Sequence, residues 1–375
     1  MKSALESFGI TIEEIGRDWQ VTPGSMQGGG TIDCGLAGTV MRFLPIVAAL
    51  ASGSTTFDGD PQARSRPMKT TIDSLRQLGV QVSNTDAHLP FTVHGTGVVD
   101  ERFVEIDASA SSQFVSALLL AGSRFQNGIE IHHKGEFIPS LPHIDMSISM
   151  LQLHGVEVES TFDSAADVKW KIAPTFIRAA DTTIEPDLSN ALPFLAAAMV
   201  TGGSVTIKDW PVESTQAGWK APQILQKMGA RFRLDEEGLT LHGPEKITGI
   251  DENLSDVGEL TPVLVSIAAF AETPSHFYGI GHLRGHETNR LEALTTEFAK
   301  CGANIEETID GLTIAPSTMH ASVFETYNDH RMVMAASVLG LNVPGIEIIN
   351  PETVSKTLPE FQQLWASMLG INNAL

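Results

Sequence analysis

The fold is decided by residues 33–50, DCGLAGTVMRFLPIVAAL, in which a small polar turn opens an almost wholly apolar helix that carries Arg42. A helix that is apolar on every side is expected to be buried. Its first turn presents backbone N–H groups and the positive end of the helix dipole, which favour an anion. Polar openings run into apolar helices at four further places, residues 111–114, 188–190, 257–259 and 328–331. Five such helix ends are enough to make one large anion site.

The composition is that of a globular protein of 375 residues, long enough for two domains. A net charge of −21 argues against binding to nucleic acid or to an acidic membrane surface. No apolar run is long enough to cross a bilayer and no signal peptide opens the chain, so we expect a cytoplasmic protein. Cys34 and Cys301 form neither a disulfide framework nor a zinc pattern, and the pair His132-His133 lacks metal-ligand spacing. We expect two buried thiols and no metal.

A helix end followed by a strand recurs along the chain at intervals of 68 to 76 residues, marked each time by a glycine: Gly9, Gly79, Gly155, Gly229, Gly302 and Gly370. Each glycine is expected to cap an amphipathic helix and to precede a short alternating strand. An apolar helix begins about forty residues before every glycine except the first. The sequence therefore predicts an α/β (α+β) fold of six units in two domains, with an incomplete first unit and a hinge in residues 177–187.

The loops before the amphipathic helices carry cations. Arg66, Arg290 and Lys356 lie 12 to 14 residues before their glycines, which predicts equivalent positions at helix starts. A cation opposes the helix dipole there, so its repeated use indicates a polyanionic ligand, with arginine offering bidentate contacts to phosphate or carboxylate. For any single one of them, a solvated surface side chain explains the residue equally well.

Seven motifs resemble those of the 5-enolpyruvylshikimate-3-phosphate (EPSP) synthases, in that family's order. They are GLAGTVMR (35–42), RSRP (64–67), SSQF (111–114), PHID (142–145), HLRGHETNR (282–290), NDHRM (328–332) and KTLP (356–359). The resemblance implies the two-domain enolpyruvyl transferase fold, each domain made of three β-α-β-α-β-β units as an inside-out α/β barrel. Residues 1–182 would form the shikimate 3-phosphate domain and residues 183–375 the phosphoenolpyruvate domain, closing over the substrates.

The resemblance also implies a reaction: transfer of the enolpyruvyl group of phosphoenolpyruvate to the 5-hydroxyl of shikimate 3-phosphate, with release of phosphate and without metal or organic cofactor. The residues that would hold shikimate 3-phosphate are Ser111, Ser112, Gln113, Ser140, Glu259 and His286. Those that would hold phosphoenolpyruvate are Gly38, Arg66, Gln113, Arg290, Arg331 and Lys356. Glu259 would accept the hydroxyl proton, Glu287 would deliver a proton to the methylene carbon, and His286 would assist catalysis. Both partners are small molecules, and a monomer is expected.

The chain departs from the family pattern in several places. Leu36, His143 and His286 stand where many members have asparagine, tyrosine and lysine. The opening motif S-K-S-x-T-N-R, whose lysine and arginine contact both substrates, is not found. We therefore expect little or no activity from this polypeptide as written, and activity from a longer product of the same reading frame.

Two other readings remain. A non-catalytic or truncated relative would bind shikimate 3-phosphate without turnover. The sister enzyme that transfers enolpyruvate to UDP-N-acetylglucosamine shares the fold, but it typically carries a reactive cysteine in the loop corresponding to residues 58–67, which has none here.

Overall fold

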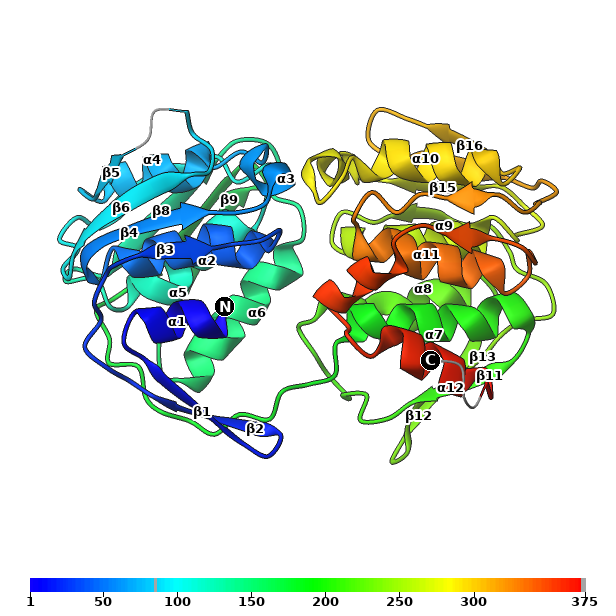
Figure 1. The fold of residues 1–375 in the computed structure, drawn as a ribbon, viewed down its shortest axis with the longest axis horizontal. Helices are drawn as coiled ribbons and strands as arrows, with labels where there is room; N and C mark the ends of the chain where they lie inside the picture. Colours follow the sequence, from blue (N-terminus) through cyan, green and yellow to red (C-terminus); the bar gives the residue numbers. More distant parts are fainter. Residues whose placement is uncertain (84–85, 372–375) are drawn as a thin grey trace. The chain divides into compact units, whose positions relative to one another are not determined.

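The computed structural model describes residues 1–83 and 86–371 and divides into two compact units, Met1–Asp181 and Thr182–Leu375 (Figure 1). The division falls in a segment, residues 173–187, that carries no helix or strand. Each unit has its own hydrophobic core. Among the described residues, no helix combines the length and the apolarity needed to cross a bilayer.

The first unit contains two complete copies of the predicted β-α-β-α-β-β motif. In each copy the first two strands are parallel and the last two pair antiparallel, giving sheet orders β3-β4-β6-β5 and β7-β8-β10-β9. The first copy consists of β3 (Thr31–Asp33), α2 (Gly38–Ala48), β4 (Ser52–Asp58), α3 (Pro61–Arg64), α4 (Lys69–Gln77), β5 (Gln81–Ser83) and β6 (Phe91–Thr96). The second consists of β7 (Phe103–Ile106), α5 (Gln113–Gly122), β8 (Ile129–Lys134), α6 (Leu141–Leu153), β9 (Glu159–Ser164) and β10 (Asp167–Ile172). Before them stands half a motif, α1 (Lys2–Ser7) and the hairpin β1 (Thr11–Ile15) and β2 (Asp18–Thr22).

The second unit contains one complete copy and two shorter ones. The complete copy, with sheet order β14-β15-β17-β16, consists of β14 (Asp251–Asn253), η2 (Gly258–Leu260), α9 (Thr261–Ala268), β15 (Ser275–Tyr278), η3 (Gly281–Gly285), α10 (Arg290–Lys300), β16 (Asn304–Glu307) and β17 (Leu312–Ala315). The copy before it has a three-stranded sheet: α7 (Leu188–Thr201), β11 (Ser204–Ile207), η1 (Ala217–Lys220), α8 (Ala221–Lys227), β12 (Arg231–Asp235) and β13 (Gly238–His242). The last has two strands: β18 (Val323–Phe324), α11 (His330–Gly340), β19 (Glu347–Ile348), η4 (Pro351–Lys356) and α12 (Phe361–Met368).

The repeated unit is thus confirmed, and among the described residues the sheets remain separate and form no closed barrel. Hydrogen bonds join strands within each motif and not between motifs, so the sheets of the described residues stay separate and none closes on itself. Each short sheet instead lies over buried helices, because the helices are apolar on all sides and the sheets on one side only.

The glycines that mark the repeat have the backbone conformation that the sequence predicts. All six have φ between +71° and +109°. Side chains rarely adopt this conformation, whereas glycine does so without steric cost.

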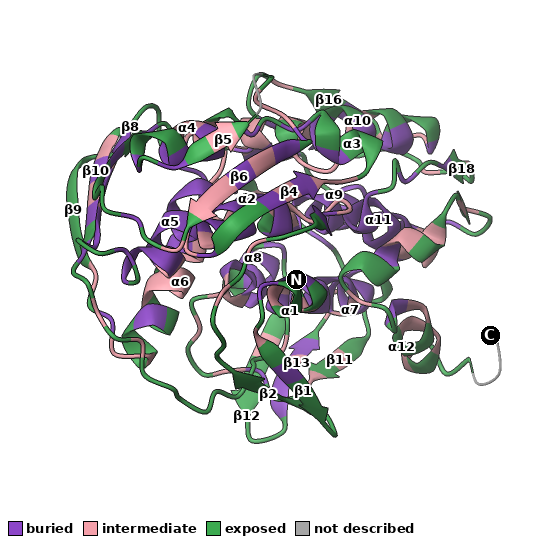
Figure 2. Cartoon of the chain, turned by 60° about the vertical axis from the view of Figure 1, so that its left-hand side comes forward, coloured by how far each residue is buried: buried purple, intermediate pink, exposed green. Residues whose placement is uncertain are grey.

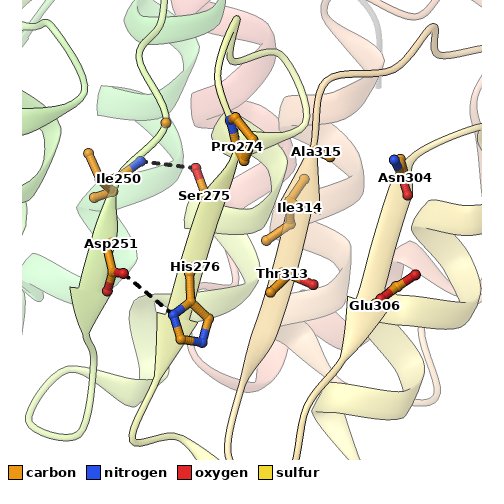
Figure 3. A pocket seen from close by; sticks show the side chains of 11 residues that line it. Ile250, Asp251, Pro274, Ser275, His276, Asn304, Glu306, Thr313, Ile314 and Ala315 are labelled. Carbon is orange, nitrogen blue, oxygen red and sulfur yellow. Dashed lines mark hydrogen bonds and ion pairs between the residues drawn. The ribbon is translucent and has the colours of Figure 1, made fainter.

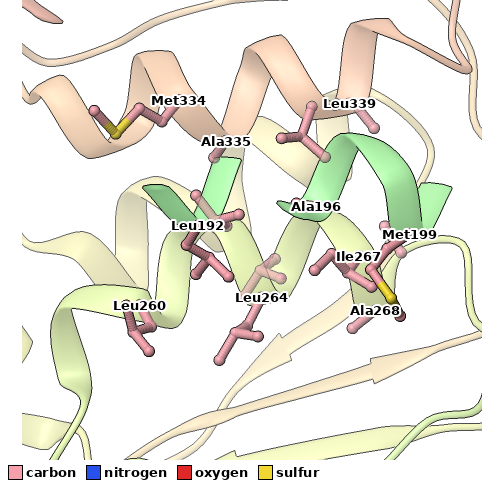
Figure 4. Packing of buried hydrophobic residues seen from close by; sticks show 14 of the residues in the cluster. Leu192, Ala196, Met199, Leu260, Leu264, Ile267, Ala268, Met334, Ala335 and Leu339 are labelled. Atoms are coloured by element: carbon pink, nitrogen blue, oxygen red, sulfur yellow. The ribbon is translucent and has the colours of Figure 1, made fainter. Parts of the chain in front are cut away.

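The apolar helices form the cores. In the second unit α7, α9 and α11 pack against one another, and Leu192, Leu264 and Ala335 are buried between them (Figure 4). In the first unit α2 packs on α5. These helices are coloured as buried in Figure 2, while much of the strand surface is exposed. Each fully buried large apolar side chain stabilises the core by about 1.5–3 kcal/mol. Because the helices are fixed by this packing, the polar residues at their first turns are fixed as well.

Candidate active site

In the first unit, Arg42 joins two of the expected site residues. Its Nη1 donates to Ser111 Oγ and to Gln113 Oε1, each at 3.0 Å. Its guanidinium carbon lies 5.0 Å from the centre of the Phe114 ring, and the residue is buried. Arg42 comes from α2 and the other three from the start of α5, so the packing of these two helices brings the openings together. Arg42 lies in the GLAGTVMR motif, but the motif alone predicted no role for it.

Gly38, at the start of α2, lies where two expected ligand residues meet. A Cβ at this position would lie 3.1 Å from Gln113 Oε1 and 3.2 Å from Arg66 Nη2, closer than most such contacts. Arg66 is buried, and its Nη1 donates to the carbonyl oxygen of Leu36 at 3.2 Å. Since this contact uses the backbone of Leu36, it does not depend on which side chain stands there.

Ser112 and Ser140 are both buried. Ser140 precedes α6 in a left-handed conformation, with φ of 55°, and its carbonyl accepts from the backbone N–H of His143 at 3.0 Å. A serine in this conformation is uncommon, and such strain is found often at ligand sites.

In the second unit, Arg290 is the centre of an ion-pair network. Its Nε and Nη2 donate to the two carboxylate oxygens of Asp329 at 2.7 and 3.1 Å, and Nη2 also donates to Glu287 Oε2 at 2.9 Å. The third nitrogen, Nη1, lies 3.2 Å from His286 Nδ1. A guanidinium can only donate, so Nδ1 accepts and the ring proton of a neutral His286 is on Nε2. Burial alone would lower the pKa of Arg290, but Asp329 and Glu287 raise it above its ordinary value.

Glu287 is shared between two cations. Its Oε1 accepts from Lys356 Nζ at 2.9 Å while Oε2 accepts from Arg290. Burial alone would raise the pKa of Glu287, but the charges of Arg290 and Lys356 hold it well below its ordinary value, so the carboxylate is ionised at neutral pH. Nearby His330 is neutral instead of charged. Burial is the main cause and the charge of Arg331 adds to it; together they lower the pKa of His330 to about 2.

Ser189 links the remaining two expected residues. Its hydroxyl donates to Glu259 Oε1 at 3.3 Å, and its carbonyl accepts from Arg331 Nη1 at 3.1 Å. The backbone N–H of Arg331 donates to Asp329 Oδ1 at 2.9 Å, which connects Glu259 through Arg331 to Arg290. Burial lowers the pKa of Arg331. The six site residues expected in this unit thus lie in one continuous network, completed by Ser189 and Asp329.

The helix-start prediction is correct for one cation. Arg290 is the first residue of α10, but Arg66 precedes α4 by three residues and Lys356 ends η4, five residues before α12. The distance from the cation to the following glycine is similar in these three repeats, but their amphipathic helices differ in length.

Two features lie away from these networks. A pocket of about 440 Å³ lies on the β14-β15-β17-β16 sheet of the second unit. Its lining mixes polar residues such as Asp251, His276 and Glu306 with apolar ones such as Ile250 and Ile314, and it contains no expected site residue (Figure 3). His133 is buried and accepts from the backbone N–H of Ala108 at 3.1 Å, while its Nε2 donates to Glu136 O at 2.7 Å. Its two ring nitrogens therefore serve the backbone.

The sequence model of EPSP synthase (3-phosphoshikimate 1-carboxyvinyltransferase) matches residues 1–365. The chain belongs to this family. It is 46% identical over 382 aligned positions to the 3-phosphoshikimate 1-carboxyvinyltransferase of Kocuria rhizophila, covering 99% of this chain and 85% of that protein.

Solved structures show the same fold. An EPSP synthase from Acinetobacter baumannii matches with a TM-score of 0.74 and 22% identity, over 98% of this chain and 86% of its own. The enolpyruvyl transferase NikO from Streptomyces tendae matches with a TM-score of 0.72 and 16% identity, over 98% and 85%. The enolpyruvyl transferase fold predicted for this EPSP synthase family member is thereby confirmed.

Proposed function

We propose that this chain transfers the enolpyruvyl group of phosphoenolpyruvate to the 5-hydroxyl of shikimate 3-phosphate and releases phosphate. Membership of the EPSP synthase family supports this reaction. The observation that carries it is the network of the second unit, where Arg290 and Lys356 share one partly buried carboxylate, Glu287. Cations held in this way offer fixed positive charge to a phosphate or carboxylate.

In this proposal Ser111, Ser112 and Ser140, with Glu259 and His286, bind shikimate 3-phosphate. Gly38, Arg66, Arg290, Arg331 and Lys356 bind phosphoenolpyruvate, and Gln113 contacts both substrates. Arg42 holds Ser111 and Gln113 at 3.0 Å, which supports a fixed arrangement of hydroxyl and amide groups. Small side chains and glycine at these helix openings allow an anion to approach the backbone N–H groups.

The carbon–oxygen bond forms between the 5-hydroxyl and C2 of phosphoenolpyruvate. Glu259 takes the hydroxyl proton, Ser189 orients that carboxylate, and a proton is added to the methylene carbon. Elimination then breaks the bond from C2 to the phosphate oxygen and removes a proton from the methyl group. Glu287 takes back the methyl proton and the proton held by Glu259 passes to the departing phosphate, so both carboxylates return to their starting state.

Glu287 is the proposed source of the methylene proton, although it is ionised in the network. A bound phosphoenolpyruvate adds negative charge beside Arg290 and Lys356 and competes for both cations. The pKa of Glu287 then rises toward the range in which a carboxyl group donates a proton near neutral pH. Binding of phosphoenolpyruvate should therefore take up a proton, which calorimetry in buffers of different ionisation enthalpy measures.

The test is release of phosphate from phosphoenolpyruvate and shikimate 3-phosphate, measured together with binding of each substrate by calorimetry. Arg290→Lys should raise the KM for phosphoenolpyruvate about 10- to 100-fold, because the bidentate contacts are lost. Arg284→Lys is the control, since Arg284 pairs with Glu307 outside the network, and its KM should stay within about threefold.

If the unaltered chain binds neither substrate and releases no phosphate, the proposal is wrong. Binding of shikimate 3-phosphate without turnover favours the non-catalytic binder, and release of phosphate only with UDP-N-acetylglucosamine favours the sister enzyme. We also propose a cytoplasmic monomer, which cell fractionation and size-exclusion chromatography would check.

A further inference from the structure

The loop before α11, residues 325–329, has a constrained backbone. Tyr327 and Asn328 follow one another in the left-handed region, with φ of 54° and 55°. For a tyrosine this conformation is unfavourable, so the surrounding structure must hold it. Directly after them comes Asp329, the carboxylate that binds Arg290 and caps α11.

A second residue of α10 faces this loop. Glu297 follows Arg290 by seven residues, two helical turns, and therefore lies on the same side of the helix. Its side chain is fully buried, yet it carries a carboxylate. Glu297 Oε1 accepts from the Tyr327 hydroxyl at 2.6 Å, and Oε2 accepts from the backbone N–H of Glu325 at 3.0 Å. Lys300 supplies the counter-charge at 2.8 and 3.0 Å.

The loop is thus held at both ends by one helix. Arg290 binds Asp329 at the end of the loop where α11 begins. Glu297, two turns further along α10, binds Tyr327 and the backbone of Glu325. Asn350 adds a hydrogen bond from its amide nitrogen to Asn328 Oδ1 at 2.6 Å. A buried carboxylate is costly to retain, and among the described residues Glu297 bonds only to this loop and to Lys300.

We propose that Glu297 and Tyr327 form a positioning clamp that sets the distance between Arg290 and Arg331, and so the affinity for phosphoenolpyruvate. Both arginines bind Asp329, one through its side chain and one through its backbone N–H. The clamp fixes the backbone that places Asp329, although neither Glu297 nor Tyr327 is among the expected ligand residues. This inference rests on the proposed function of the arginines.

Burial and the hydrogen bond to Glu297 raise the pKa of Tyr327, so the hydroxyl remains a donor through the neutral range. The residue is 39% exposed, and removal of the hydroxyl leaves no large cavity. Tyr327→Phe is therefore a narrow test of the hydrogen bond.

The chain has two tyrosines, which provides a matched control. Tyr278 stacks on His276 in β15, outside the network. With shikimate 3-phosphate saturating, Tyr327→Phe should raise the KM for phosphoenolpyruvate about 5- to 30-fold and change kcat less. The KM for shikimate 3-phosphate should stay within about twofold, and Tyr278→Phe should leave both values unchanged. An unchanged KM for phosphoenolpyruvate, or equal losses for both substrates, overturns the clamp.

A measurement on the unaltered sequence covers the case in which Tyr327→Phe fails to fold. Protein labelled with 3-fluorotyrosine should give two fluorine signals, assigned with Tyr278→Phe. Phosphoenolpyruvate should shift the Tyr327 signal more than the Tyr278 signal, and binding without such a shift overturns the clamp. If phosphoenolpyruvate binds and no phosphate is released, the proposed reaction fails while the affinity of Tyr327→Phe still tests the clamp. No binding of phosphoenolpyruvate overturns both.

Discussion

Replacing Asp329 by asparagine should destabilise the second unit. The loss should be larger than for the same kind of substitution, carboxylate to amide, at any other helix cap. The Asp329 side chain is fully buried, and its partner Arg290 is 3% exposed. Removing one partner of a buried ion pair costs about 3–5 kcal/mol, because the other charge stays buried. Two contacts reduce this cost: asparagine still caps α11, and Arg290 keeps Glu287 at 2.9 Å. We therefore expect a loss of about 2–3 kcal/mol in the free energy of unfolding.

Urea unfolding measures this loss without screening the charges. With a slope of about 2 kcal/mol per molar urea, the midpoint should fall by about 1–1.5 M. Asp187→Asn is the control, because Asp187 caps α7 through Asn190 and is exposed. It should cost less than about 0.5 kcal/mol. If Asp329→Asn costs no more than this control, the ion pair with Arg290 does not contribute the stability assigned to it.

Three further predictions concern charge, thiols and backbone. Because the folded pKa of Glu287 is depressed, its contribution to stability is present above its ordinary value of about 4.5 and is lost as pH falls through the folded value. The urea midpoint should thus fall below about pH 5 less steeply in Glu287→Gln than in the unaltered chain, and parallel curves would contradict this. Burial raises the pKa of Cys34 to about 12 and that of Cys301 to about 11, so Ellman's reagent at pH 8 should modify them at least a hundredfold more slowly in native protein than in urea. Rapid native modification would contradict the burial. At Gly79, with φ of 75° and the nearest other atom 3.6 Å from an added Cβ, alanine should cost about 1 kcal/mol through the backbone alone, and an unchanged urea midpoint would refute that reasoning.

The sequence predicts most residues of the candidate site, but not which of them pair with one another. The polar helix openings and loop cations led to Gln113, Arg290 and Arg331, and the family motifs supplied the proposed roles. Asp329 lay in a quoted motif without a role, although a carboxylate directly before an apolar helix is a typical cap. Ser189 carried no signal beyond its place in a polar opening.

The pairings could not be predicted because their partners are distant in the chain. Lys356 and Glu287 are 69 residues apart, and Arg331 and Ser189 are 142 apart. Hydrophobic periodicity reports on neighbouring residues, while a pairing of this kind depends on how α7, α10 and α11 pack. Glu297 would be read from the sequence as an exposed position on an amphipathic helix, and only the fold reveals its burial.

The sequence by itself determined the repeat, its glycine caps and the burial of the apolar helices, because each follows from local backbone preference or from the polarity of successive residues. It also determined the family, through motifs in a fixed order. Tertiary structure alone decided which carboxylate neutralises which cation and how separate the sheets remain. Those outcomes depend on distances between elements, and a buried charge is stabilised only by the partner that packing brings within a few ångströms.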